Sequence, residues 1–156
     1  MINNIALHFV PENIYLIANW GVVPLWLMIL LMPNHGITKF FAHSVVIPVL
    51  LGVAYIFLCY EIFLNENIFD VFNLYLGLDN LYSIFSNETF LLVFWLHFLS
   101  ISLFVGSWIS RDSKKYLIPR LLTSISLILV YFTGPIGLFF YWFVRIFFSR
   151  KISFND

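Results

Sequence analysis

Long stretches with almost no charged side chains limit the fold of this chain more than any other feature. Four of them are Leu25–Met32, Val45–Tyr60, Phe90–Ile109 and Leu121–Phe148. A transmembrane helix needs roughly 20 predominantly apolar residues. Of the 156 residues, 62% are hydrophobic and 10% are charged, whereas about a quarter of the residues in a soluble domain are charged. The sequence therefore predicts an all-α, multi-pass integral membrane protein.

We expect one membrane domain over residues 1–156, built as a four-helix transmembrane bundle. The four helices are predicted at about residues 14–32, 38–64, 90–109 and 119–148. Between the second and the third, residues 66–87 interleave apolar positions with Asp70 and Asp79. A charged side chain costs about 2.5–3.5 kcal/mol at the middle of a bilayer. This segment is therefore predicted to form short amphipathic helices that lie at the membrane interface.

Two segments with proline and glycine predict changes of chain direction. Pro33-Asn34-His35-Gly36 is a stop and turn signal after the first helix. Gly134-Pro135-Ile136-Gly137 falls in the middle of the last predicted helix. Proline removes a backbone donor there and its ring clashes with the preceding turn. We therefore expect a kink or an unwound turn within the helix at 119–148.

Charged residues separate onto two sides when the chain crosses the membrane four times. The acidic side is predicted to hold Glu12, Glu61, Glu66, Asp70, Asp79 and Glu88. The other side is predicted to hold Lys39, Arg111, Lys114, Lys115 and Arg120. Because cytoplasmic loops carry an excess of Lys and Arg, the loop from Arg111 to Arg120 is placed in the cytoplasm. Arg145, Arg150 and Lys151 then fall on the acidic side, against the same rule.

Net charge and cysteine content exclude several other classes of protein. The formal net charge is zero, so no electrostatic argument supports a nucleic-acid partner. The single cysteine, Cys59, cannot form an intramolecular disulfide. His35 and His43 lack an HxxxH spacing and a cysteine partner. No metal site and no cofactor are therefore predicted.

Three polar residues in or beside the apolar runs are candidates for chemistry. His97 is a ligand, a general acid or base, a hydrogen-bond donor to a buried oxygen, or a structural histidine bonded to a neighbouring helix. Asn19 needs a partner in an apolar medium, and either orients a ligand or clamps the first helix to the third. Asp112 follows the third predicted helix, where a solvated capping role is the alternative to a functional one.

The chain resembles a known membrane family over most of its length. The motif WLHFLSISLFVGSWISRDS, followed by IPRLLTSISLILVYFTGPIGLFFY, is similar to the neoxanthin-synthase-like family, named for the plant abscisic-acid-deficient-four protein. The matching positions are Trp95, His97, Leu103, Phe104, Gly106, Asp112, Gly134, Pro135 and Gly137. The family also tends to have N, P, P and T around its first helix, and this chain has Asn19, Pro24, Pro33 and Thr38 there, with Trp26 among them.

The resemblance implies a function in carotenoid chemistry. Plant members are implicated in converting violaxanthin to neoxanthin, an isomerisation that opens an epoxide into an allene without a redox cofactor. The implied partners are the lipid bilayer and a carotenoid or other apolar isoprenoid, in a bacterial inner membrane or a plastid membrane. The implied catalytic residues are His97 and Asp112, and the implied ligand-binding residues are Asn19, Trp26, Trp95, Gly106, Gly134 and Pro135.

Two family positions differ in this chain. The family's aspartate in the middle of the third helix is Ser102 here, and its arginine five residues later is Ser107. We interpret this as an intramembrane ion pair replaced by neutral residues, which leaves the apolar helices without paired charges. The alternative functions are therefore a non-catalytic small subunit or assembly factor of a larger membrane complex, with or without bound pigment, and a small transporter or channel-like subunit. Coupled ion transport is disfavoured by the missing paired charges.

Overall fold

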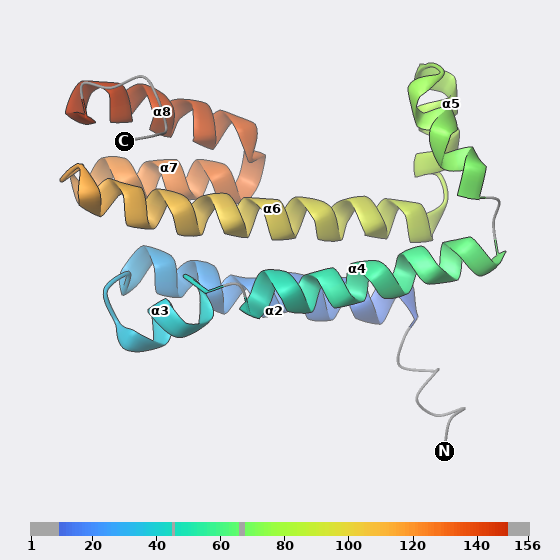
Figure 1. The fold of residues 1–156 in the computed structure, drawn as a ribbon, viewed down its shortest axis with the longest axis horizontal. Coiled ribbons are helices and arrows are strands. Elements are labelled where there is room, and N and C mark those ends of the chain that lie inside the picture. Colours follow the sequence, from blue (N-terminus) through green and yellow to red (C-terminus); the bar gives the residue numbers. More distant parts are fainter. Residues whose placement is uncertain (1–9, 45, 66–67, 150–156) are drawn as a thin grey trace. The chain divides into compact units, whose positions relative to one another are not determined.

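The computed structural model describes residues 10–44, 46–65 and 68–149, and this part of the chain is helical with no strand. Its elements are α2 (Pro11–Leu31), α3 (Gly36–Phe41), α4 (Val46–Asn65), the 3-10 helix η1 (Ile68–Tyr75), α5 (Leu78–Phe85), α6 (Glu88–Lys115), α7 (Arg120–Thr133) and α8 (Pro135–Ser149) (Figure 1). The predicted all-α class is confirmed. The number and bounds of the predicted helices need correction.

The chain divides into two compact units. Unit 1 comprises Met1–Gly21 and Val49–Ser100, and unit 2 comprises Val22–Pro48 and Ile101–Asp156. The helices α2 and α6 each contribute their first part to unit 1 and their second part to unit 2. Each unit has its own apolar core. Ile14, Leu58 and Leu96 are buried in unit 1, whereas Ile29 and Val130 are buried in unit 2.

The second predicted helix, 38–64, is wrong as a single element, because the chain breaks it into α3 and α4. Thr38 anchors the short helix α3, since its hydroxyl donates to the carbonyl of Met32 at 2.7 Å. After Phe41 the chain turns, and the hydroxyl of Ser44 accepts the amide of Val46 at 3.2 Å. This contact satisfies one of the unpaired amides at the start of α4. A polar turn therefore replaces a continuous helix.

The connection between the predicted second and third helices has the expected composition. Within residues 66–87, η1 and α5 form two short helices that meet at Gly77, whose φ is 138°. Positions 66 and 67 lie outside the described residues. No residue of α5 is buried. One or two short helices were predicted here, and the structure has two. Their placement at a membrane interface stays a prediction.

The third predicted helix, 90–109, extends further than expected, because α6 continues to Lys115. It ends in a hydrogen-bonding pattern that normally uses glycine. The amide of Ile118 donates to the carbonyl of Ser113 at 2.9 Å, and that of Leu117 donates to Lys114 at 3.3 Å. Leu117 has a positive φ of 52° at the position where this helix end requires a left-handed residue. Asp112 therefore lies inside the last turns of α6, and the alternative of a solvated capping residue in a loop is wrong.

The last predicted helix, 119–148, is wrong as a single kinked helix. The chain reverses at Gly134, so that α7 and α8 pack against each other as a helical hairpin (Figure 1). Gly134 has a φ of 59°, which favours glycine, and its amide caps α7 by donating to Val130 at 2.9 Å. Pro135 then starts α8, where a missing amide has no helical partner to lose. The predicted break is at the expected residues, but it turns the chain back on itself.

Close approach of the two hairpin helices depends on Gly137. A Cβ atom at this position would lie 2.6 Å from the carbonyl carbon of Leu129 and would also meet the backbone nitrogen of Val130. Backbone atoms in a helix cannot move aside as the end of a flexible side chain can. The hairpin therefore packs backbone against backbone at this point.

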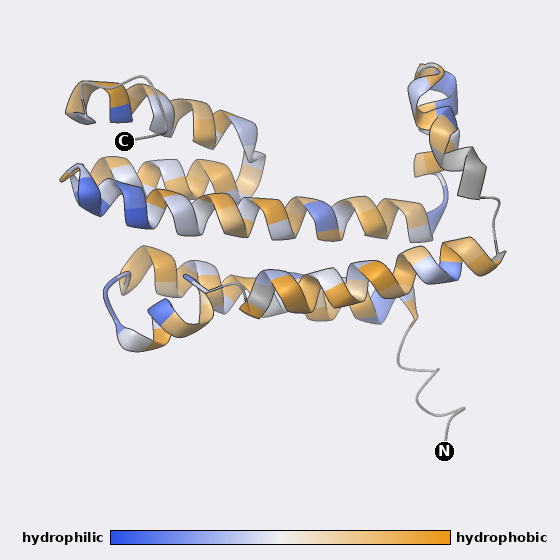
Figure 2. Ribbon diagram, in the orientation of Figure 1, coloured by the Kyte–Doolittle hydropathy of each residue, from blue (hydrophilic) through white to orange (hydrophobic). Residues whose placement is uncertain are grey.

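Among the described residues, two helices are long and apolar enough to cross a membrane, α2 and α6. The apolar part of α4, Pro48–Leu64, and the helices α7 and α8 are shorter. Apolar residues run along all of these helices (Figure 2). Large apolar side chains are exposed on them, with Ile17 at 71%, Trp20 at 70% and Phe132 at 72%. The predicted four crossings thus exceed the two that helix length supports.

Candidate functional site

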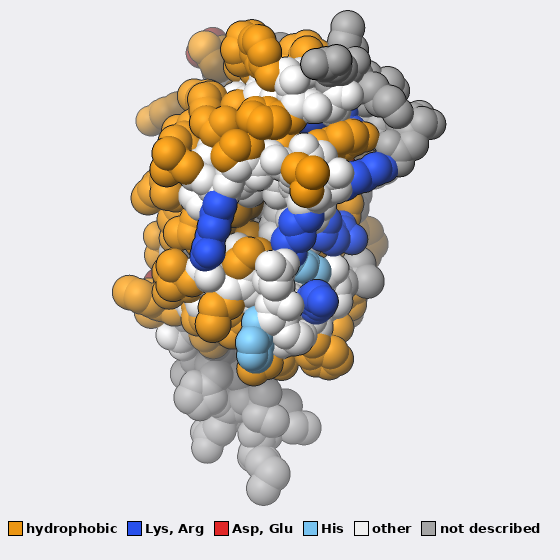
Figure 3. Space-filling model, turned by 90° about the vertical axis from the view of Figure 1, so that its left-hand side faces the viewer, with side chains coloured by type: hydrophobic (Ala, Val, Ile, Leu, Met, Phe, Trp, Pro, Cys, Tyr) orange, Lys and Arg blue, Asp and Glu red, His pale blue; other side chains and the backbone are white. Residues whose placement is uncertain are grey.

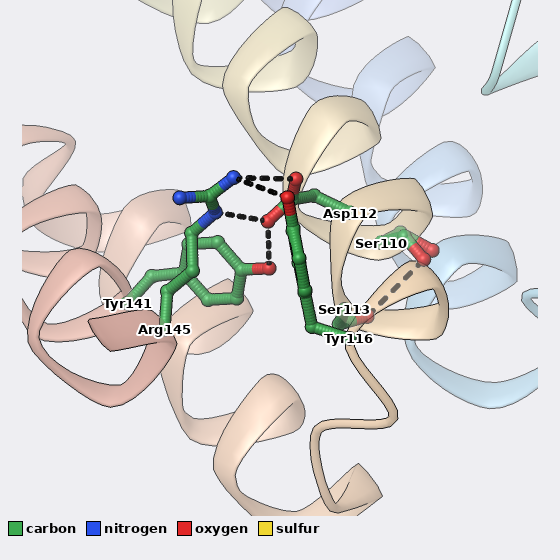
Figure 4. Close-up of polar contacts among 6 residues, drawn as sticks. All are labelled: Ser110, Asp112, Ser113, Tyr116, Tyr141 and Arg145. Carbon is green, nitrogen blue, oxygen red and sulfur yellow. Dashed lines mark hydrogen bonds and ion pairs between the residues drawn. The ribbon is translucent and has the colours of Figure 1, made fainter. Parts of the chain in front are cut away.

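A buried ion pair joins α6 to α8 in unit 2. Arg145 is 1% exposed, and its Nε donates to Oδ2 of Asp112 at 2.7 Å (Figure 4). A second guanidinium nitrogen lies 3.5 Å from Oδ1 of the same carboxylate. Asp112 is itself only 10% exposed. Because charge-assisted hydrogen bonds are about twice as strong as neutral ones, this pair ties the hairpin to the end of α6.

Two tyrosines complete the cluster around the ion pair. The hydroxyl of Tyr141 donates to Oδ2 of Asp112 at 2.7 Å, and Arg145 donates to the hydroxyl of Tyr116 at 3.1 Å (Figure 4). The guanidinium of Arg145 also lies 4.5 Å from the ring centroid of Tyr116, in range for a cation–π contact. Trp108 meets the Tyr141 ring edge to face at 5.4 Å. The carboxylate of Asp112 is therefore held as an acceptor by two donors.

The sequence prediction singled out Asp112 but missed Arg145, Tyr141 and Tyr116. It assigned Arg145 to the basic residues near the C-terminus. A signal was present, because Arg145 interrupts the apolar segment Gly137–Phe148, and an ionisable residue in such a segment marks a functional hypothesis with a partner to be found. The expectation that the apolar helices lack paired charges is wrong, since Arg145 lies inside the predicted helix 119–148 and pairs with Asp112.

His43 and Ser110 form a second polar contact in unit 2. Nε2 of His43 and Oγ of Ser110 are 3.2 Å apart, within hydrogen-bond distance. Burial, and then the positive charges of Lys114, Arg111 and Lys39, lower the pKa of His43 from 6.5 to about 4. The imidazole is therefore neutral in the folded protein at physiological pH, and the turn before α4 is built around an uncharged ring.

This lowered pKa predicts a stability that depends on pH. Between pH 6.5 and pH 4 the unfolded chain binds a proton at His43 that the folded protein does not. The contribution of the neutral His43 to the free energy of unfolding is therefore complete above pH 6.5 and is lost as the pH falls toward 4. We expect wild-type protein to lose about 1 to 2 kcal/mol of stability over this window through His43, after allowance for solvent screening. Thermal unfolding of His43→Gln measured across the window should show a flatter profile. His35→Gln, which replaces an exposed histidine, is the control variant. If His43→Gln kept the pH dependence of the wild-type unfolding temperature, the assignment of the lowered pKa to His43 would be contradicted.

Asn19 and Trp95, two predicted ligand-binding residues, come together in unit 1. Nε1 of Trp95 donates to Oδ1 of Asn19 at 2.9 Å. This hydrogen bond clamps α2 to α6, which was one of the two roles predicted for Asn19. The ring of Trp95 also faces Tyr15 at 6.2 Å between centroids. Trp95 and Tyr15 line a pocket of about 480 Å³ together with Leu92, and its wall also includes the carboxyl-bearing Glu88. Both the amide clamp and the pocket therefore depend on one tryptophan.

His97 also lies in unit 1, on the exposed side of α6. Its ring centroid is 6.4 Å from that of Tyr55 on α4. His97 and Asp112, the two predicted catalytic residues, are not brought together in one unit, since Asp112 belongs to unit 2. Their roles stay predictions. Ser102 and Ser107 are both buried in unit 2.

Trp26 and Gly106, two further predicted ligand-binding residues, contact each other in unit 2. A Cβ atom on Gly106 would lie 2.5 Å from the Trp26 ring, so the absence of a side chain makes room for the indole. Trp26 is 7% exposed, and Tyr131 meets its ring edge to face at 5.5 Å. Both rings line a smaller pocket of about 190 Å³, whose other walls include Leu127.

The last two predicted ligand-binding residues, Gly134 and Pro135, form the turn of the hairpin. The carbonyl of Gly134 accepts the amide of Leu138 at 3.1 Å. In residues 10–44, 46–65 and 68–149 no group of three or more His, Cys, Asp or Glu side chains is arranged to hold a metal ion.

Comparison with known proteins adds one finding. Residues 13–141 match the protein family described as ABA DEFICIENT 4-like. No curated protein and no solved structure matches the chain. The match covers the residues from Asn19 to Tyr141 that were described above, and Arg145 lies just beyond it.

Proposed function

This chain belongs to the ABA DEFICIENT 4-like family, and from that membership we propose that it is a membrane protein that binds a carotenoid or a similar isoprenoid and isomerises it by acid–base chemistry. The observation that carries the proposal is the apolar pocket of unit 1. Trp95 and Tyr15 supply aromatic walls to a space of about 480 Å³. Apolar walls with few polar groups are typical of sites for apolar small molecules.

The membrane location is supported by the helices and by the hairpin. The helices α2 and α6 are long enough to cross a bilayer. At about 1.5 Å per residue, the 14 residues of α7 span roughly 21 Å, less than the roughly 30 Å of a hydrocarbon core. We infer a re-entrant hairpin that returns the chain to the end of unit 2 from which α7 starts.

His97 is our proposed proton-transferring residue. Opening an epoxide into an allene requires one proton delivered to the epoxide oxygen and one removed from carbon, so atoms and electrons balance without an oxidant or a reductant. An imidazole ring can both deliver and accept a proton, so one histidine can serve both steps. Asp112 remains a proposed supporting residue, acting through the structure of the α6 end and the hairpin.

The test is to purify the protein in mild detergent from a carotenoid-producing host and to record its visible absorption spectrum. Trp95→Ala should lose most of the co-purifying polyene, because it removes a wall of the pocket and the donor to Asn19. Trp20→Ala is the matched control, since Trp20 is 70% exposed on α2. His97→Ala should retain pigment but abolish any change of isomer relative to the host pool, as measured by chromatography of the extracted pigment.

Three results would count against the proposal or a part of it. A colourless wild-type protein from a pigmented host would exclude carotenoid binding. Recovery of that protein with a defined larger complex would favour the accessory-subunit alternative. Equal amounts of co-purified pigment in wild type and Trp95→Ala would exclude this pocket as the binding site. If the wild-type protein binds pigment but its isomers match those of the host pool, pigment binding would be supported and catalysis of isomerisation would be excluded.

A further inference from the structure

Basic and acidic residues are segregated between the two units. Every Lys and Arg of the chain falls within the residue ranges of unit 2. Unit 2 has two acidic residues in its sequence, Asp112 and Asp156, and the first is already paired with Arg145. The described part of unit 2 therefore holds six basic side chains, those of Lys39, Arg111, Lys114, Lys115, Arg120 and Arg145, and one acidic side chain, that of Asp112. Lys, Arg and His side chains gather on one face (Figure 3).

A pocket of about 380 Å³ opens among these cations. It lies between the end of α2, the end of α6 and the start of α7, and Lys114 and Arg120 are part of its wall. Ser113 and Asn34 add polar groups. The rest of the lining is mostly aliphatic and includes Ile29, Leu30, Ile118 and Leu127. The pocket therefore offers positive charge and hydrogen-bond donors together with an apolar wall.

The two cations of the pocket are held in place by backbone carbonyls at the end of α2. Nζ of Lys114 donates to the carbonyl of Pro33 at 2.8 Å. A guanidinium nitrogen of Arg120 donates to the carbonyl of Leu31 at 2.7 Å. An ammonium has three donors and a guanidinium has five, so both groups keep donors for a ligand. In the described part of the chain neither forms an ion pair with a carboxylate. The positive charge is thus positioned but not neutralised.

The surface beside the pocket is apolar. Leu117 is 85% exposed and Leu121 is 72% exposed, and both flank the turn into α7. Leu117 is held at a positive φ where glycine would be unstrained, so an apolar side chain is kept here at a conformational cost. A small soluble anion would gain nothing from this apolar surface, whereas an amphipathic anion would contact both parts.

We propose that this pocket binds an anionic phospholipid, with its phosphate between Lys114 and Arg120 and its acyl part against Ile118 and Leu127. The assignment rests on the proposed membrane location and is independent of the carotenoid. Each cationic group near a membrane surface strengthens binding to anionic lipids by about fivefold. The fixed pair at the pocket should therefore distinguish phosphatidylglycerol from phosphatidylcholine.

The experiment compares the protein in nanodiscs of phosphatidylcholine alone and of phosphatidylcholine mixed with phosphatidylglycerol. Native mass spectrometry of detergent-released protein counts retained lipid, and thermal unfolding gives a second readout. Wild type should retain phosphatidylglycerol and unfold at a higher temperature in the mixed discs. The double variant Lys114→Gln/Arg120→Gln should bind it about tenfold or more weakly, given two lost cations. Lys39→Gln/Arg111→Gln removes the same charge outside the pocket and should bind as wild type does.

Further arms separate the pocket from its alternatives. Ser124→Phe places a ring in the pocket wall while both cations remain, so it should also lose the lipid, and it covers the case in which the double variant fails to fold. Equal loss of phosphatidylglycerol in the two double variants would overturn the proposal and would show that general surface charge attracts the lipid. Stabilisation by inorganic phosphate alone would replace the lipid with a soluble anion. Pigment measured on the same samples distinguishes this outcome from failure of the proposed function.

Discussion

Asp112→Ala is expected to lower the free energy of unfolding by about 3 to 5 kcal/mol, the range for breaking a buried ion pair on one side. The substitution leaves the guanidinium of Arg145, 1% exposed, without its carboxylate. It also removes the acceptor of the Tyr141 hydroxyl. Reversible unfolding in detergent micelles, followed by circular dichroism, measures the change.

The matched double variant identifies the cause of that loss. Asp112→Leu/Arg145→Met removes both charges, and replacing a buried pair by apolar residues is often neutral or stabilising. We therefore expect it to be more stable than Asp112→Ala by several kcal/mol. Arg111→Met removes an exposed arginine on the same helix and should change stability by less than about 0.5 kcal/mol. A double variant as unstable as Asp112→Ala would mean that the hydrogen bonds with Tyr141 and Tyr116, and not the ion pair, stabilise the cluster.

Gly137→Ala is expected to destabilise the protein by about 3 kcal/mol, the upper part of the range for overpacking. The added Cβ would meet the backbone of Leu129 and Val130. These atoms belong to the hydrogen-bonded body of α7, so the two helices must separate. The separation would also displace Arg145 from Asp112, since both hairpin contacts depend on the position of α8. Unfolding midpoints, together with protease cleavage near residues 133–136, report the change.

Gly21→Ala is the control for the hairpin variant. Nothing lies within 4 Å of a Cβ built on Gly21, which is also in a helix. Alanine is favoured over glycine in a helix by about 0.5–1 kcal/mol, so this variant should be slightly more stable than wild type. A Gly137→Ala protein with wild-type stability would show that α7 and α8 do not pack backbone to backbone.

The candidate site was predicted in part. Asn19 and Trp95 were predicted separately, and the amide of Asn19 was expected to need a partner, because a buried polar group without one is costly. Which partner it takes depends on the rotation of α6, and Trp95 turned out to supply it. Arg145 was visible as a charge in an apolar segment. Its partner was not, because Asp112 lies 33 positions away and is reached only when the chain reverses.

Local chemistry decided where the helices begin and break. The apolar stretches between polar turns made the chain helical. The sequence at Gly134-Pro135 also located a break, because proline cannot continue the helix and glycine tolerates a positive φ.

Tertiary structure alone decided the angle of that break and everything that depends on it. A kink and a full reversal have the same sequence signal, and they differ only in whether α8 can pack against α7. Gly137 permits that packing, and it carries no local signal of its own because its importance lies in the backbone of Leu129 and Val130 opposite. The ion pair of Arg145 with Asp112 follows from this contact between residues that the sequence does not place next to one another.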